Sequence, residues 1–345
     1  MAKLSFRLAC LLALAIGATG LSAQDVEVDS FTIPRPSELP VPTYPSRPLS
    51  YGGEGLVEIT FMVGEDGKAF DPVISRYTGD EAFHDAALAA LAKAEFVPAM
   101  QSGEPIVGSA RLRYEFTLTE ASSSASKSFT SLFGRFQRAL QGDDRKKIDD
   151  LLALLEREGA ANHYENAFLN LARYNYAVRF GDEREQLEYL DGALSEQVSV
   201  DDPVYLEADV VRELRRALLQ LQLRTNRFPE ALDTYALMQA DGDDEAVAFF
   251  AEAIEAVHAV ESDGTQYLIP LSLNAGGSAW IDLYKHHFAL TGGAGGLSEA
   301  KLRCEKQYVA FAVERDIAYD VPSEWGDCTL EIVGDADASL ALLQR

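Results

Sequence analysis

Cysteine and histidine, the residue types that most often build metal and nucleophilic centres, are scarce in this 345-residue chain. It contains three cysteines and five histidines, and no CxxC pair occurs. Zinc and redox sites use cysteine or histidine at short, regular spacing, which is lacking here. Long apolar runs are lacking as well, because nothing after the first 25 residues reaches the ~20 apolar residues of a membrane-spanning helix. We therefore expect neither a zinc-finger protein nor a multi-span membrane protein.

Positive charge is also in short supply. Lysine and arginine number 30 against 55 aspartate and glutamate residues, which gives a formal net charge of −25. Such a charge repels nucleic acid and anionic lipid head groups, and it favours solubility. We expect no nucleic-acid partner.

The first residues have the layout of a secretory signal peptide. Lys3 and Arg7 precede a short apolar core, and small residues lead to Ala23. Cys10 stands at the front of the apolar core, where a lipoprotein cysteine would have to follow it. The prediction is a signal peptide at 1–23 and a periplasmic protein. An uncleaved signal would instead anchor the chain in the inner membrane, facing the periplasm.

Removal of the signal peptide leaves two cysteines, Cys304 and Cys328. In an oxidising compartment such a pair favours a disulfide over a metal or redox site. We predict this disulfide in a small β-rich C-terminal module, residues 265–345, where β-rich segments alternate with glycine-rich turns.

Proline marks the next segment, 24–43, as a linker. Five prolines between Phe31 and Pro45 favour extended backbone and prevent a helix or a central strand. Residues 44–120 then predict a small β-β-α-β domain. Its hairpin turn is Asp66-Gly67, a strong short-range turn signal, and its helix places Phe83, Ala87 and Leu91 on one face.

Residues 121–128 form a low-complexity break, and helical patterns fill 129–262. The helices come in pairs whose turns recur at Gly142, Gly181 and Asn226, about 40 residues apart. This repetition is typical of an α-solenoid. The predicted fold class is therefore α+β and multidomain, with a β-β-α-β domain, a helical-repeat domain and a β-rich module. The predicted helices are Phe129–Leu140, Ile148–Leu155, Tyr164–Phe180, Gln186–Leu194, Tyr205–Arg224, Glu230–Met238 and Asp244–Val260.

Residues 44–118 resemble the C-terminal domain of the TonB family. The resemblance is carried, in order along the chain, by Tyr44-Pro45, Gly55–Val63, Asp66-Gly67, Phe83, Ala86-Ala87, Phe96–Ala99, Gly103–Pro105 and Phe116. The helical region resembles tetratricopeptide repeats more loosely, through segments such as Asn226–Leu232, and is best described as degenerate.

The TonB resemblance implies a protein-binding role in transport across the outer membrane. Family members bind outer-membrane transporters, and a short sheet leaves an edge that accepts a partner strand. The expected partner is a TonB-dependent receptor or another TonB-system protein. The expected edge residues are Ile106, Val107, Arg111, Leu112, Arg113, Tyr114 and Phe116, with Val41 and Tyr44 as contacts in the preceding segment.

Departures from the family point to an adaptor. A full transducer has an N-terminal membrane helix and a long proline-rich span, whereas the apolar segment and the linker here are short. The predicted function is a non-catalytic periplasmic adaptor that also holds a partner on its helical repeats. Two alternatives stay open: a cell-envelope scaffold unrelated to energised uptake, and a hydrolase-like activity in residues 265–345.

Two sequence features could suggest a metal site, but neither supports one. His286 and His287 are adjacent on a predicted strand, so their side chains point to opposite faces. Asp241–Glu245 resembles the start of a calcium loop, but Ala246 stands where the loop needs glycine, and a turn with a helix N-cap fits better. We also find no nucleophile–base pairing and no phosphate-binding loop. The prediction is no metal, no cofactor and no catalysis.

Overall fold

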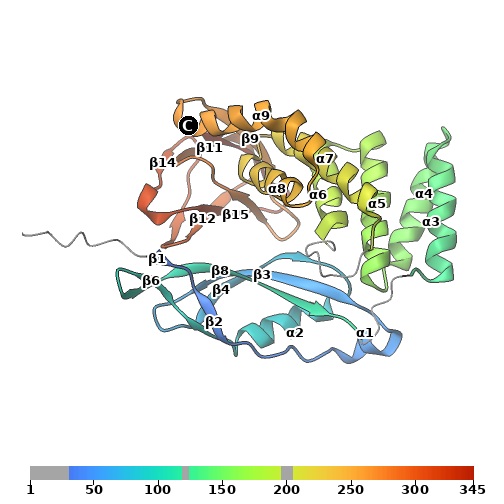
Figure 1. Ribbon diagram of the computed structural model, residues 1–345, viewed down its shortest axis with the longest axis horizontal. Helices are drawn as coiled ribbons and strands as arrows, with labels where there is room; N and C mark the ends of the chain where they lie inside the picture. Colours follow the sequence, from blue (N-terminus) through green and yellow to red (C-terminus); the bar gives the residue numbers. More distant parts are fainter. Residues whose placement is uncertain (1–30, 119–123, 196–204) are drawn as a thin grey trace, which may run out of the picture.

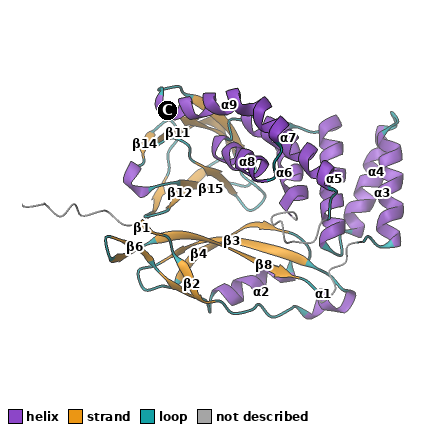
Figure 2. Cartoon of the chain, viewed as in Figure 1, coloured by secondary structure: helices purple, strands orange, loops and turns teal. Residues whose placement is uncertain are grey.

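The protein is a mixed helix-and-sheet molecule in three parts, shown in Figures 1 and 2. The computed structural model describes residues 31–118, 124–195 and 205–345. The predicted signal peptide, 1–23, lies outside these ranges. Among the described residues, no helix combines the length and the apolar character that crossing a membrane requires.

The N-terminal domain, residues 31–118, is built on a three-stranded antiparallel sheet. Strand β3 (Gly55–Val63) lies in the centre, between β4 (Ala69–Tyr77) and β8 (Gly108–Phe116). Helix α2 (Ala82–Leu91) follows β4. Gly67 has a φ of 75° in the hairpin turn between β3 and β4, where a side chain would be strained. The predicted β-β-α-β order is confirmed.

Strand β3 alternates between two environments. Val57, Ile59 and Phe61 are fully buried and pack with Phe83 of helix α2 in one hydrophobic cluster. Because successive side chains of a strand point to opposite faces, Glu58 and Thr60 lie on the other face of the sheet. In Figure 1 that second face looks toward the helices and the C-terminal strands.

The proline-rich segment is not a free linker, which corrects the prediction for residues 31–38. Strand β1 (Phe31–Thr32) pairs with β6 (Ala99–Gln101), and β2 (Arg35–Glu38) pairs with β5 (Glu95–Val97). Extended backbone is what the prolines favour, and here that backbone lies at the edges of small sheets, where a missing N–H is tolerated. A short helix, α1 (Ser46–Tyr51), then leads into β3.

The helical region consists of consecutive helices whose cores overlap. Each of three hydrophobic clusters is shared by three successive helices, so every helix packs on its neighbours in the chain. All seven predicted helices are present, with ends shifted by a few residues. They are α3 (Lys127–Leu140), α4 (Arg145–Glu158), α5 (His163–Phe180), α6 (Glu183–Leu194), α7 (Ala208–Arg224), α8 (Phe228–Ala240) and α9 (Asp244–Ser262).

The C-terminal module packs two four-stranded antiparallel sheets around one core. The first has the order β10-β15-β12-β13 and the second β14-β11-β16-β9. The strands are β9 (Tyr267–Ser272), β10 (Ser278–Asp282), β11 (His287–Ala294), β12 (Leu297–Cys304), β13 (Tyr308–Ala312), β14 (Ala318–Asp320), β15 (Cys328–Gly334) and β16 (Ser339–Gln344).

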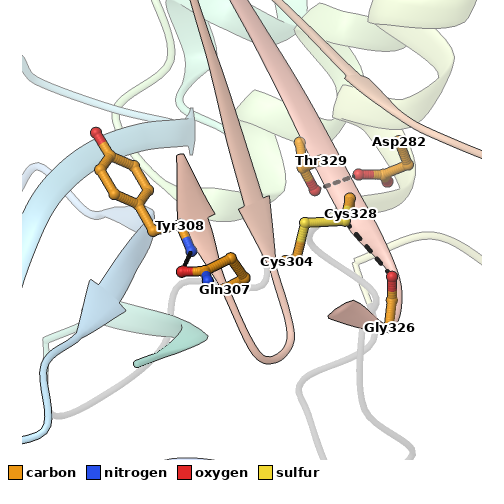
Figure 3. The surroundings of a disulfide bond; sticks show 7 residues. All are labelled: Asp282, Cys304, Gln307, Tyr308, Gly326, Cys328 and Thr329. Atoms are coloured by element: carbon orange, nitrogen blue, oxygen red, sulfur yellow. Dashed lines mark hydrogen bonds between the residues drawn. A yellow bond between two sulfur atoms is a disulfide. The ribbon is translucent and has the colours of Figure 1, made fainter. Parts of the chain in front are cut away.

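The predicted disulfide between Cys304 and Cys328 is confirmed (Figure 3). The two residues face each other in the register of β12 and β15, so the bond joins neighbouring strands of one sheet.

We expect the double variant C304S/C328S to lower the free energy of unfolding of this module by about 3 kcal/mol. The bond spans 24 residues of sequence, and its loss frees a loop of that length in the unfolded chain. Both tryptophans of the protein, Trp280 and Trp325, lie in this module, so tryptophan fluorescence in urea reports its unfolding. A loss of less than about 1 kcal/mol would show that strand pairing alone stabilises the module and that the disulfide adds little.

A buried ion-pair network holds the N-terminal domain against the C-terminal module. Arg303 of β12 has a fully buried side chain, and its guanidinium contacts Asp71 of β4 and Glu331 of β15, the latter at 2.8 Å. Lys301 reaches Asp71 at 3.2 Å. On the helical side, Arg76 of β4 pairs with Asp191 of α6 at 2.7 Å. Both of these ion-paired contacts with the N-terminal domain are made through β4.

Candidate partner-binding edge

Strand β8 is the more regular of the two edges of the N-terminal sheet. Its nine residues pair with β3 without a shift in register. The opposite edge, β4, has two register shifts and contains Pro72, which has no N–H to donate. Bulges and proline are the usual ways in which an edge is closed to further pairing. An added strand therefore fits β8 better than β4.

The backbone groups of β8 that point away from β3 follow from the hydrogen bonds of Leu56. Its carbonyl accepts from the Thr78 N–H at 2.9 Å, and its own N–H donates to the Thr78 hydroxyl at 3.2 Å, so Leu56 faces β4. Antiparallel pairing alternates, which directs Val57 and every second residue of β3 toward β8. The β8 residues that align with this set of β3 residues form backbone hydrogen bonds to β3. The remaining ones, Ser109, Arg111, Arg113 and Glu115, direct their N–H and C=O groups outward.

The expected edge residues fall into two groups by side chain. Leu112, Tyr114 and Phe116 point into the core with α2, and Tyr114 and Phe116 are 6% and 1% exposed. They can meet a partner only through strand backbone. Arg111 and Arg113 lie on the other face, where Arg111 has an exposed side chain and stands 3.8 Å from Glu58.

Arg113 is held in place more firmly than Arg111. It pairs with Glu115 at 2.8 Å and donates to the Ser195 carbonyl at 3.0 Å.

Ile106 and Val107, the first two of the expected edge residues, are outside β8. Ile106 ends β7 (Glu104–Ile106), which pairs with β6, and Val107 lies between β7 and β8.

The two expected contacts ahead of the domain differ. Val41 is 90% exposed and available to a partner. Tyr44 is engaged within the domain. Its ring lies edge-on to Phe83 and Phe116, with centroids 5.6 and 5.8 Å away, and its hydroxyl donates to the Gly53 carbonyl. Tyr44 therefore acts first as a packing residue of the core.

Comparison with known proteins bears on this same domain. Residues 40–118 match the family model described as Gram-negative bacterial TonB protein C-terminal. These residues form a TonB C-terminal family domain. The solution NMR structure of the Pseudomonas aeruginosa TonB CTD is similar at 24% identity, with a TM-score of 0.24, over 26% of this chain and 90% of that one. No curated protein matches the chain.

A cavity of about 410 Å³ lies where the TonB C-terminal domain meets α8 and the C-terminal module. Ser109 of β8 contributes to its wall, and the rest includes the carboxylates of Asp233, Asp282 and Asp327 beside the cations Lys285 and Arg303. His286 also lines it, but no hydrogen bond joins its ring to the hydroxyl of Ser109 or of Thr329. Thr329 donates instead to Asp282 at 2.5 Å. These lining residues do not form the nucleophile–base pair that covalent hydrolysis uses.

Neither candidate metal feature gathers ligands. Within the ranges that the structure describes, no three His, Cys, Asp or Glu side chains come together as a metal site. His287 instead contacts Asp320 at 2.6 Å. Asp243 accepts from the Ala246 N–H at 3.3 Å and so caps α9, which is the N-cap predicted for the Asp241–Glu245 stretch.

Glu230, in the first turn of α8, has a raised pKa. Burial is the main cause, Asp282 adds to it, Arg227 opposes it, and the pKa is raised to about 7. One carboxylate oxygen of Glu230 is buried without a hydrogen-bond partner. Because the folded pKa lies above the unfolded one, the protonated form favours folding. The stability that protonated Glu230 contributes is fully present below about pH 4.5 and is lost as the pH rises through 7.

We expect Glu230→Gln to stabilise the protein at pH 8.5, by roughly 1–2 kcal/mol, and to change little at pH 5. Glutamine keeps the shape of the side chain and removes the buried charge. Urea unfolding of both proteins at the two pH values measures the difference. A variant that is less stable than the natural protein at pH 8.5 would mean that the Arg227 ion pair outweighs the burial of the carboxylate.

The outward backbone groups of Ser109 and Glu115 were not among the predicted site residues. Their place depends on which residues of β8 face β3, and the sequence contains a weak signal for it. The apolar positions Leu112, Tyr114 and Phe116 fix one alternate set, and the outward backbone groups belong to the other. What the sequence does not show is whether β8 stands at an edge at all.

Proposed function

We propose that this protein is a non-catalytic periplasmic adaptor of a TonB-type system for energy-coupled transport across the outer membrane. The match of residues 40–118 to the TonB C-terminal family supports the assignment. The single observation that carries the binding mode is the regular, unbulged edge of β8 within that domain.

The proposed binding step is the addition of a partner strand to β8. Outward N–H and C=O groups on four residues offer main-chain hydrogen bonds, each worth about 0.5–1.5 kcal/mol net. The exposed Arg111 side chain lies beside this edge and can select an acidic group on the partner. The expected partner is the periplasmic segment of a TonB-dependent receptor, or another TonB-system protein.

The helices α3–α9 serve, in this proposal, as a degenerate tetratricopeptide-like solenoid that holds a second protein. Support comes from helix pairs packed in sequence order, each sharing a core with the next. In stacked repeats of this kind, the extended surface is the usual binding surface. The place of action is the periplasm, with inner-membrane association if the signal stays uncleaved.

We expect Arg111→Pro to abolish capture of the receptor, whereas Arg111→Ala keeps most of it. Proline removes the outward N–H at the middle of β8, and this N–H makes no bond to β3. The alanine variant removes the same side chain and keeps the donor. The measurement is recovery of TonB-dependent receptors from solubilised outer membrane by the full chain with a C-terminal tag.

Equal recovery by the two Arg111 variants would contradict strand addition at β8. Recovery of no TonB-dependent receptor and no TonB-system protein by the natural chain would contradict the transport role itself. In that case a deletion strain with normal uptake and a leaky envelope would identify the alternative, a structural scaffold of the cell envelope.

A further inference from the structure

The first helix pair of the repeat region carries a basic groove on an otherwise acidic protein. The groove lies along α3 and α4, has a volume of about 690 Å³, and is lined by Arg135, Arg138, Ala139, Asp144, Lys146, Lys147, Asp150, Leu151 and Leu154. Residues of α5 do not contribute to it. In Figure 1 the α3–α4 pair forms one end of the molecule, so the groove lies at the outer end of the helical stack.

Three cations of this groove have no counter-charge. Asp144 accepts from the Lys147 N–H and so caps α4, and Asp150 pairs with Lys146 at 2.8 Å. The side chains of Arg135, Arg138 and Lys147 pair with no acidic group in the described part of the chain. A polar outer face is normal at the end of a repeat stack, but a net positive one is unexpected in a chain of charge −25.

The last helix of the stack has the opposite character. Phe249 of α9 is 73% exposed, which is unusual for an aromatic side chain. Glu245 and Glu252 stand four residues before it and three after it, on the same side of the helix. Glu255 flanks the same stripe. We call these four residues the acidic ridge. It lies opposite the face that α9 buries with Phe250, Ile254 and Val257.

We propose that the acidic ridge of one copy binds the basic groove of a second copy, so that chains associate head to tail. Phe249 would lie over Leu151 and Leu154 between Arg135 and Arg138, where a guanidinium also favours an aromatic face. The carboxylates of Glu252 and Glu255 would meet the three unpaired cations, whereas Glu245 already lies 3.4 Å from Arg216 of its own chain.

A second copy is favoured as the occupant because surfaces of complementary charge belong to the same chain and lie on the first helix pair and on the last helix of one helical stack. The groove lies on the end where a further repeat would pack, whereas at the other end the C-terminal module packs on α9 through Val257 and Val260, and the ridge is the face of α9 that stays exposed. The contact is heterologous, since each copy gives its groove to one neighbour and its ridge to another. An anionic membrane fits less well, because the rest of the molecule would be repelled from it.

The test is sedimentation velocity of the full chain over a concentration series, with two variants on separate chains. Arg138→Glu damages the groove, and Glu252→Lys damages the ridge. We expect the natural chain to self-associate and each variant to do so at least about 10-fold more weakly. An equimolar mixture of the two variants should recover association through a heterodimer, because one chain keeps an intact ridge and the other an intact groove.

Arg184→Glu is the matched control for Arg138→Glu, since it changes the net charge by the same amount on exposed α6 surface away from the groove and the ridge. A monomeric natural chain at all concentrations would overturn the proposal, and so would a mixture that forms no heterodimer. Equal weakening by Arg184→Glu would also overturn it, because general repulsion would then explain the effect. Binding of a glutamate-rich peptide to the groove of a strictly monomeric chain would assign the groove to another acidic protein.

Discussion

Replacing Arg303 with methionine is expected to lower the free energy of unfolding of the C-terminal module by about 3–5 kcal/mol. The Arg303 side chain is fully buried, and that of its partner Glu331 is 8% exposed. The guanidinium also stacks over the Trp280 ring, 4.4 Å from its centroid. Methionine fills much of the volume but leaves the carboxylates of Glu331 and Asp71 with only Lys301 as a cation.

Urea unfolding followed by tryptophan fluorescence measures this loss, because Trp280 and Trp325 are the only tryptophans. Arg345→Met is the control, since it removes an exposed arginine of the same module and should change stability by less than about 0.5 kcal/mol. The loss of the Asp71 contact should also loosen the N-terminal domain. A change at Arg303 no larger than at Arg345 would show that the network contributes little to holding the two parts together.

Replacing Phe83 with alanine is expected to destabilise the TonB C-terminal domain by about 3–5 kcal/mol. Phe83 is fully buried, and its ring stacks on Phe116 with the centroids 4.3 Å apart. It joins α2 to β8, so its removal leaves a cavity beneath the proposed binding edge. We expect the variant to lose binding of a partner strand at β8 as well as stability.

The domain contains no tryptophan, so amide hydrogen exchange of the central strand β3 is the suitable measurement. The slowest β3 amides report global opening, and they should exchange faster by a factor that corresponds to the lost free energy. Phe249→Ala is the matched control, because it makes the same substitution at an exposed site. Unchanged protection of β3 in the Phe83 variant would contradict the central place of this residue in the core.

Local signals explain which parts of the fold the sequence reveals. Asp66-Gly67 marks the hairpin, and Phe83, Ala87 and Leu91 mark one face of α2, so the β-β-α-β domain follows from neighbouring residues alone. The helices of the middle region follow from the same kind of periodicity. The predicted ends of these helices differ from the observed ends by a few residues, because capping residues such as Asp243 stand beside other acidic residues in the sequence.

Strands β12 and β16 are decided by distant residues and do not follow from their own sequences. In β12, Lys301 and Arg303 read as solvent-exposed charges, yet both are paired with Asp71, which lies 230 or more residues earlier in the chain. Strand β16 has the sequence SLALLQ, whose leucines and alanine favour a helix, but pairing with β9 and β11 on both sides makes it a strand.

The candidate site was predictable in part. The alternation in β8 identifies its buried side, and the resemblance to the TonB family points to this strand. That β8 is an edge strand depends on the strand order, and here the only local signal is Pro72, which marks β4 as the other edge. The basic groove was not predicted, because Arg135 and Arg138 lie on α3, Lys147 lies on α4, and in the sequence all three look like ordinary surface charge.

Amide hydrogen exchange along β8, with and without the receptor captured by the full chain, tests the binding edge most directly. The outward N–H groups of Ser109, Arg111, Arg113 and Glu115 should exchange more slowly in the complex. Those of Ala110, Leu112 and Tyr114 should change little, because they already bond to β3. Slower exchange confined to the helices, with no change at Arg111 and Arg113, would contradict strand addition at this edge.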